Sequence, residues 1–263
     1  MSKQADVTWT ATLEHEGRVE FRVGRSGDER IAEWPGLATL RANVESGQTD
    51  LSFGDDTDAR WRAKLERGLA HGMLRQLRGG LALHASAVAI EGRGALLVGP
   101  SGAGKSTLAA MLVERAGAEL IADDASAVTF EDGDGWVEPT DTEVWLWPEA
   151  RQLMGNDAMT SEKRPVELAS TARERVRIAS VFVLEFGDHI GMNPIRGHRV
   201  LSALVAATIR LVVDEPERQL HELALLDRLV SSTTVRELVR PRDFSSIDAS
   251  MRAVVDATLL DGP

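Results

Sequence analysis

A glycine-rich segment that follows an apolar run has the residue types and spacing of a phosphate-binding loop. Residues 99–107 read Gly-Pro-Ser-Gly-Ala-Gly-Lys-Ser-Thr and fit the pattern G-x-x-x-x-G-K-[ST], directly after Ala-Leu-Leu-Val at 95–98. Glycines allow consecutive backbone N–H groups to point at one anion, and the helix that follows contributes its positive N-terminus. Lys105 would reach the β- and γ-phosphates, and the hydroxyl of Ser106 would be a magnesium ligand. The segment predicts a nucleoside triphosphate site with Mg²⁺; the alternative is a glycine-rich turn with a surface lysine.

The residues expected to contact the nucleotide are Gly99, Ser101, Gly102, Ala103, Gly104, Lys105, Ser106 and Thr107.

Two adjacent carboxylates end the next predicted strand. Asp123 and Asp124 follow the strand-like run at 118–122, which comes after the helix of the glycine-rich segment. Ligands of such sheets gather at the carboxyl ends of strands, so we expect both aspartates near the γ-phosphate. One carboxylate can hold magnesium and the other can take the proton of an acceptor hydroxyl, with their roles left open. The alternative is a turn with solvated aspartates.

Three weaker candidates lie elsewhere in the chain. His84 stands in an apolar strand fifteen residues before Gly99, where a satisfied core histidine is the simpler interpretation. Glu185 ends the run Val-Phe-Val-Leu at 181–184 and could bind magnesium or orient a water molecule; a surface acid is the alternative. A basic stretch spans 163–177, and one of its cations could neutralise a transferring phosphoryl group. Its members are Lys163, Arg164, Arg173, Arg175 and Arg177.

The elements that position these residues indicate an α/β fold with a mixed sheet. Residues 1–58 alternate polar and apolar side chains, which favours a small β-rich region, and 59–263 form the expected main domain. An apolar stripe with a four-residue period predicts one helix over 58–77. The run 81–90, the turn 91–94 and the strand before Gly99 suggest a hairpin, which departs from a purely parallel sheet. Helices are expected at 200–212 and 217–230, and Trp145 and Trp147 are expected to share one buried strand face.

Composition excludes several classes of function. The formal net charge is −11, so nucleic acid and anionic membranes are poor partners. The absence of cysteine removes disulfides and thiolate chemistry and fits a reducing cytoplasm. No uninterrupted apolar stretch reaches the length of a membrane span, and the N-terminus lacks the apolar core of a signal peptide. The six histidines share no metal-ligand spacing, so no zinc site is predicted.

Four segments in order resemble the catalytic domain of HPr serine kinase/phosphorylase and its relatives, among them kinases encoded with lasso peptide pathways. These segments are Leu-His-Ala-Ser-Ala-Val at 83–88, the glycine-rich segment at 99–107, Ile-Ala-Asp-Asp at 121–124 and Glu-Val-Trp-Leu-Trp-Pro-Glu at 143–149. The resemblance covers about residues 80 to 150. It implies the fold of that kinase domain and ATP-dependent, magnesium-dependent phosphorylation of a serine hydroxyl. It also implies that His84 lies in the active site and that Asp123 and Asp124 serve acid/base and metal roles.

The chain also departs from the bifunctional enzymes of that family. Its first 58 residues are much shorter than their separate N-terminal domain, and the second signature stretch of the family has no match here. Phosphorolysis and HPr as the substrate are therefore not predicted. The hydroxyl acceptor, on a protein, a peptide or a small molecule, is left open, as is a homo-oligomeric state. The rival hypothesis is a nucleotide-dependent switch or ATPase without a hydroxyl acceptor, in which Glu185 orients water.

Overall fold

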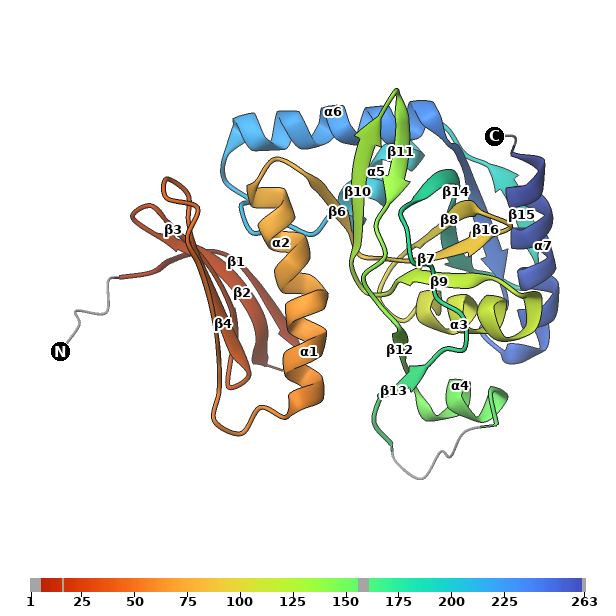
Figure 1. Ribbon diagram of the computed structural model, residues 1–263, viewed down its shortest axis with the longest axis horizontal. Helices are drawn as coiled ribbons and strands as arrows, with labels where there is room; N and C mark the ends of the chain where they lie inside the picture. Colours follow the sequence, from red (N-terminus) through yellow and green to blue (C-terminus); the bar gives the residue numbers. More distant parts are fainter. Residues whose placement is uncertain (1–5, 16, 156–160, 262–263) are drawn as a thin grey trace. The chain divides into compact units, whose positions relative to one another are not determined.

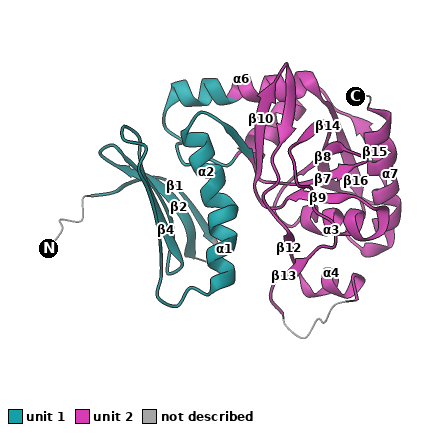
Figure 2. Cartoon of the chain, viewed as in Figure 1, with its two compact units in different colours: residues 1–82, 209–222 teal, residues 83–208, 223–263 magenta. Residues whose placement is uncertain are grey.

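The computed structural model describes residues 6–15, 17–155 and 161–261 (Figure 1). The chain divides into two compact units (Figure 2). Unit 1 contains residues 1–82 and 209–222, and unit 2 contains residues 83–208 and 223–263. These units divide the chain differently from the expected boundary at residue 58, which stays a prediction. No helix in the described ranges is long and apolar enough to cross a bilayer.

Unit 1 is built on a five-stranded antiparallel sheet in which each strand pairs with the next. Its strands are β1 (Thr8–His15), β2 (Arg18–Ser26), β3 (Glu29–Trp34), β4 (Ala38–Asn43) and β5 (Thr49–Phe53). On β4 the burial alternates strictly, because one face of the strand packs inward and the other faces solvent. The β-rich region expected from the alternating pattern is confirmed. Helices α1 (Ala59–Arg67) and α2 (Leu69–Leu77) follow, and then the short strand β6 (Leu81–Leu83).

Gly68 splits the single helix expected over 58–77 into α1 and α2. Its N–H donates to the Lys64 carbonyl and closes α1, and its backbone then leaves the helical region with ψ −108°. A Cβ at this position would lie 2.7 Å from that carbonyl oxygen. Glycine disfavours helix interiors and tolerates such geometry, so the helix breaks here.

The large sheet of unit 2 contains strands in the order β10-β11-β14-β8-β7-β9, with β16 also paired to β14 and β15 to β16. These strands are β7 (Ala85–Ile90), β8 (Arg93–Val98), β9 (Glu119–Ala122), β10 (Ser126–Glu131), β11 (Asp134–Val137), β14 (Val176–Phe186), β15 (Gly191–Pro194) and β16 (Thr234–Arg240). β8, β14 and β16 are parallel. β7 is antiparallel to both β8 and β9, so the predicted hairpin and the mixed sheet are confirmed.

Helices and a small two-stranded sheet complete unit 2. These are α3 (Lys105–Ala116), β12 (Glu143–Leu146), α4 (Pro148–Leu153), β13 (Arg164–Glu167), α5 (His198–Ala207), the 3₁₀ turn η1 (Phe244–Ser246) and α7 (Ile247–Leu260), with α6 (Pro216–Ser232) beginning in unit 1. α3 packs against α7 (Figure 1). Leu108 and Leu112 of α3, Leu97 of β8, Phe182 of β14 and Val254 of α7 belong to one buried core. This core anchors the strand and the helix on either side of the glycine-rich segment.

The helix expected over 200–212 ends earlier, at Ala207. Thr208 is extended, and the Ile209 N–H donates to the Ala82 carbonyl at 2.9 Å. The side-chain oxygen of Gln76 then accepts from the N–H groups of Leu211 and Val212 at 3.3 Å each. The apolar run is buried as expected, but its backbone bonds go to other segments and not to a helical turn.

Replacing Phe182 by alanine should lower the free energy of unfolding of unit 2 by about 3–5 kcal/mol, because a fully buried aromatic ring is lost from the core. Urea denaturation followed by circular dichroism measures the change. Leu260→Ala, at the exposed end of α7, is the control and should change stability by less than about 0.5 kcal/mol. Equal effects of the two substitutions would contradict the assignment of the core.

Candidate functional site

The predicted site residues of unit 2 come together at one edge of the large sheet. The strands β8, β14 and β16 are parallel, and β9 runs in the same direction as β8 because both are antiparallel to β7. Their carboxyl ends therefore lie at the same edge. Gly99 follows β8, Asp123 follows β9, and β7 begins there, directly after His84. The expectation that the aspartates lie beside the glycine-rich segment is met by this topology.

The glycine-rich segment, residues 99–107, has the backbone of an anion cradle; we call it the phosphate loop. Gly99 and Gly104 have φ values of 149° and 81°, where side chains other than glycine are strained. Gly104 caps α3 without any side-chain hydrogen bond, so the first N–H groups of this twelve-residue helix have no capping side chain. The Lys105 amine is buried and donates to the carbonyl oxygens of Gly99 and Pro100 at 2.9 and 3.2 Å.

Asp123 is the buried carboxylate of the site, with 5% of its surface exposed. Its Oδ1 accepts from the Ser86 hydroxyl at 2.5 Å. Burial, followed by repulsion from Asp124, raises the pKa of Asp123 to about 7, and the hydroxyls of Ser86 and Ser106 oppose this rise. The carboxylate therefore holds its proton more tightly than an exposed aspartate and lies near Ser106 of the phosphate loop.

Asp124 occupies a strained turn that His84 supports. Its φ is +64°, in the left-handed region that non-glycine residues seldom adopt, and the Ala125 N–H closes the turn on the Asp123 carbonyl at 2.8 Å. Nδ1 of His84 lies 2.9 Å from the Asp124 carbonyl oxygen, and the His84 N–H donates to the Ala207 carbonyl. Burial, with the charge of Lys105 as a second cause, lowers the pKa of His84. A neutral imidazole that donates from Nδ1 fits this position.

Three further residues of the site carry no motif that would single them out in the sequence. Ser86 stands in the apolar run of β7, and its hydroxyl holds Asp123. Asp141 accepts from the Asp123 N–H at 3.0 Å and from the Thr140 hydroxyl at 2.8 Å. Arg240 ends β16 and donates to the Ala103 carbonyl. Ser86 lies within the 83–88 segment that resembles the kinase family and is the one polar side chain of β7. No sequence signal singles out Asp141 or Arg240, since β16 contains several polar residues.

The weaker candidates separate in the structure. Glu185 lies near the carboxyl end of β14 and is exposed. In the basic stretch, Arg175 pairs with Glu131, and Arg177 pairs with Asp134 at 2.9 Å. Lys163 differs, because its charge is a minor cause of the lowered pKa of both His84 and Lys105. Its amine lies 5.6 Å from the centre of the Trp147 ring.

Trp145 and Trp147 do not share a buried face. Trp145 lies on β12 and is buried, but the strand ends at Leu146. Trp147 is 52% exposed and precedes Pro148, which begins α4. The expected pairing of the two rings in the core was wrong because proline fixes the start of a helix where the strand was expected to continue.

Oxygen donors that suit magnesium meet beside the phosphate loop. The Ser106 hydroxyl lies close enough to the Asp123 carboxylate to lower its pKa, and Asp124 follows in the chain. Mg²⁺ is commonly bound through one or two carboxylates together with substrate phosphates and water. Among residues 6–15, 17–155 and 161–261 no group of three or more His, Asp or Glu side chains could hold a metal ion by itself. The residues present therefore fit a magnesium ion that a nucleotide brings with it.

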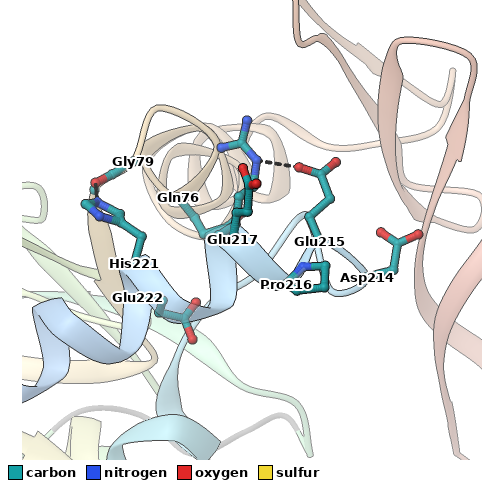
Figure 3. Close-up of a pocket in the computed structure, with 10 residues that line it drawn as sticks. Gln76, Gly79, Asp214, Glu215, Pro216, Glu217, His221 and Glu222 are labelled. Carbon is teal, nitrogen blue, oxygen red and sulfur yellow. Dashed lines mark hydrogen bonds and ion pairs between the residues drawn. The ribbon is translucent and has the colours of Figure 1, made fainter.

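Unit 1 contains a separate pocket of about 680 Å³ between α2 and the start of α6 (Figure 3). None of the predicted site residues lines it. Its polar groups bond to one another: His221 meets the Gly79 carbonyl at 2.8 Å, Glu215 accepts from Arg218 at 2.7 Å, and Glu222 is paired with Arg210. Most of its charged side chains are thus already paired, and it offers no chemistry like that beside the phosphate loop.

The sequence model of the HPr Serine kinase C-terminal domain matches residues 75–140, which include His84, the phosphate loop and both aspartates. This segment is HPr-kinase-like. The match suggests a kinase with ATP-dependent activity. A search of curated proteins finds no match to the chain.

Among solved structures, the Hpr(Ser) kinase/phosphatase from Coxiella burnetii is similar at 13% sequence identity, with 68% of this chain and 91% of that chain covered and a TM-score of 0.35. A superposition this loose carries no argument about function.

The raised pKa of Asp123 predicts a pH-dependent stability in the metal-free protein. The pKa of Asp123 is 3.8 in an ordinary aspartate and about 7 in the folded protein, so the folded state binds this proton more tightly than the unfolded state. The contribution of this proton to stability is therefore lost as the pH rises through about 7. The Tm of the wild type, measured with a chelator present, should fall relative to that of Asp123→Asn between about pH 5 and pH 8.

Ser86→Ala provides a second arm of the same measurement. It removes a hydroxyl that favours the charged carboxylate, so the fall in stability should shift to higher pH. A difference in Tm between wild type and Asp123→Asn that stays constant across this range would contradict the raised pKa.

Proposed function

We propose that this protein is an ATP-dependent kinase that transfers the γ-phosphoryl group to a serine-type hydroxyl. The observation that carries the proposal is that the phosphate loop, which follows β8, and the acidic pair, which follows β9, lie at the same edge of the large sheet, with Ser106 close enough to the buried Asp123 to lower its pKa. This arrangement supports one site made of the loop and the acidic pair. The family match over residues 75–140 supports the same activity.

The phosphate loop has the role of holding the triphosphate. Its N–H groups and the N-terminus of α3 would bind the phosphate oxygens, and Lys105 would turn from the carbonyls of Gly99 and Pro100 to the β- and γ-phosphates. Mg²⁺ would be held by Ser106 and Asp123, which leaves Asp124 for the acceptor. The ion would neutralise charge on the phosphate oxygens.

Asp124 is the group that we assign to the acceptor. Its side chain is partly exposed, whereas Asp123 is buried among hydroxyl donors. In the transfer, the acceptor oxygen forms a bond to the γ-phosphorus, and the bond from that phosphorus to the bridging oxygen breaks, which releases ADP. The acceptor proton goes to the Asp124 carboxylate. His84 holds the strained Asp124 backbone and thereby orients the carboxylate.

The acceptor is a hydroxyl compound whose identity the site leaves open. The matched family favours a protein or peptide serine as the acceptor. Lys163, whose charge acts weakly on the pKa of His84, is the member of the basic stretch that we propose as the cation for the transferring phosphoryl group. We retain the homo-oligomer as a further expectation of the family resemblance.

Asp124→Asn should lower phosphoryl transfer by about 10²- to 10⁴-fold, because it removes the general base, while the Kd for MgATP stays close to that of the wild type. The assay follows the γ-labelled phosphoryl group of ATP into serine-containing proteins, peptides and small hydroxyl compounds.

Lys105→Met should instead weaken ATP binding by about tenfold or more, since it removes charged hydrogen bonds to phosphate.

The competing function, a switch or ATPase without an acceptor, makes the opposite prediction. It predicts slow release of inorganic phosphate from ATP without an acceptor. If Glu185→Gln abolishes this release and Asp124→Asn preserves it, the protein is an ATPase or switch and the kinase proposal is wrong. Glu185 lies near the carboxyl end of β14, the same end of the sheet as the phosphate loop.

A further inference from the structure

We propose that Arg240 is a positioning residue of the phosphate loop, which orients the peptide between Ala103 and Gly104 and places a second buried positive charge behind the polyphosphate. The inference rests on the proposed function, in that the loop must bind a nucleoside triphosphate.

Arg240 reaches the loop from the end of a neighbouring strand. It is the last residue of β16, which pairs in parallel with β14, and only 4% of its surface is exposed. Its Nη2 donates to the Ala103 carbonyl at 2.7 Å. A Cβ on residue 104 would clash with the same nitrogen, so the guanidinium fits only because that residue is glycine. Gly104 therefore serves both the backbone of the loop and the packing of the arginine.

The hydrogen bond determines the direction of one N–H group of the cradle. In a trans peptide the carbonyl and the following N–H point in opposite directions. By holding the Ala103 carbonyl, Arg240 turns the Gly104 N–H away from itself. Backbone N–H groups of a phosphate loop are the groups that bind the phosphates. An arginine on this carbonyl therefore keeps the peptide in one orientation before the nucleotide arrives.

The charge of Arg240 lacks a carboxylate partner among the described residues. Its Nε has no hydrogen-bond partner there, and the ring of Phe186 lies 5.4 Å from the guanidinium. Burial lowers the pKa of Arg240, with no acidic group among the causes. Buried charges are normally paired. The polyphosphate of a bound nucleotide is the anion that would supply the missing negative charge at this loop.

A second arginine of the same strand shows the ordinary arrangement. Arg236, four residues earlier on β16, is paired with Asp261, with Nη2 2.7 Å from Oδ1. Within the described ranges its guanidinium pairs with Asp261 and not with the phosphate loop. Removing Arg236 therefore tests what the loss of a strand arginine does to stability alone, and this makes it the matched control.

The test measures the binding of MgATP and of inorganic tripolyphosphate to the full chain by calorimetry, together with the Tm without and with each ligand. Arg240→Met should weaken both ligands by about ten- to a hundredfold, because an oriented N–H and a fixed charge are lost. The ligand-induced rise in Tm should shrink accordingly. Arg236→Met should lower the Tm of the ligand-free protein and leave both affinities unchanged.

Arg240→Lys keeps the charge but not the planar donor, so it should bind more tightly than Arg240→Met and less tightly than the wild type. This variant decides the question if Arg240→Met does not fold. Wild-type affinity in a folded Arg240→Met or Arg240→Lys protein would overturn the inference and leave the proposed function intact. A wild-type protein that binds neither ligand would overturn the proposed function itself.

Discussion

The burial of one carboxylate beside the phosphate loop is the constraint on which the rest of the site depends. Asp123 loses almost all contact with water, and an isolated buried charge would be costly. The Ser86 hydroxyl of β7 offsets part of this cost by donating to the carboxylate, and the hydroxyl of Ser106 in α3 also favours its charged form. The strand, the helix and the acidic turn thus meet at one point, beside the phosphate loop.

The strained turn at Asp124 comes directly after this buried carboxylate. An extended chain after β9 would send the two adjacent carboxylates to opposite faces of the sheet. The left-handed backbone of Asp124, closed by Ala125 and held by His84, changes that direction. Strain of this kind persists only where surrounding contacts support it. The histidine therefore has a physical reason to stand at the start of β7, apart from any direct contact with a phosphate.

Positive charge gathers at the phosphate loop although the chain as a whole is acidic. The protein is acidic, with a formal net charge of −11, yet two buried cations meet at the phosphate loop. Lys105 donates to loop carbonyls from within, and Arg240 holds the loop from the neighbouring strand. Local positive potential at a backbone cradle is what a polyphosphate requires, and an acidic surface elsewhere discourages other polyanions.

The glycine-rich loop, the aspartate pair and the hairpin before the loop could be predicted from the sequence, because each depends on residues that are close together in the chain. Glycine geometry, strand periodicity and the lysine spacing are local properties. The tertiary structure alone decided which distant side chains complete the site. Ser86, Asp141 and Arg240 lie 37, 18 and 137 residues from their partners. The pairing of β7 with β9 brings Ser86 to Asp123, and the pairing of β16 with β14 and of β14 with β8 brings Arg240 to the loop. Asp141 is held there by backbone bonds from residues 140 and 141 to the Ile121 carbonyl. The same dependence explains why the helix expected over 200–212 stopped at Ala207: its backbone found partners far away in the chain, which no local pattern records.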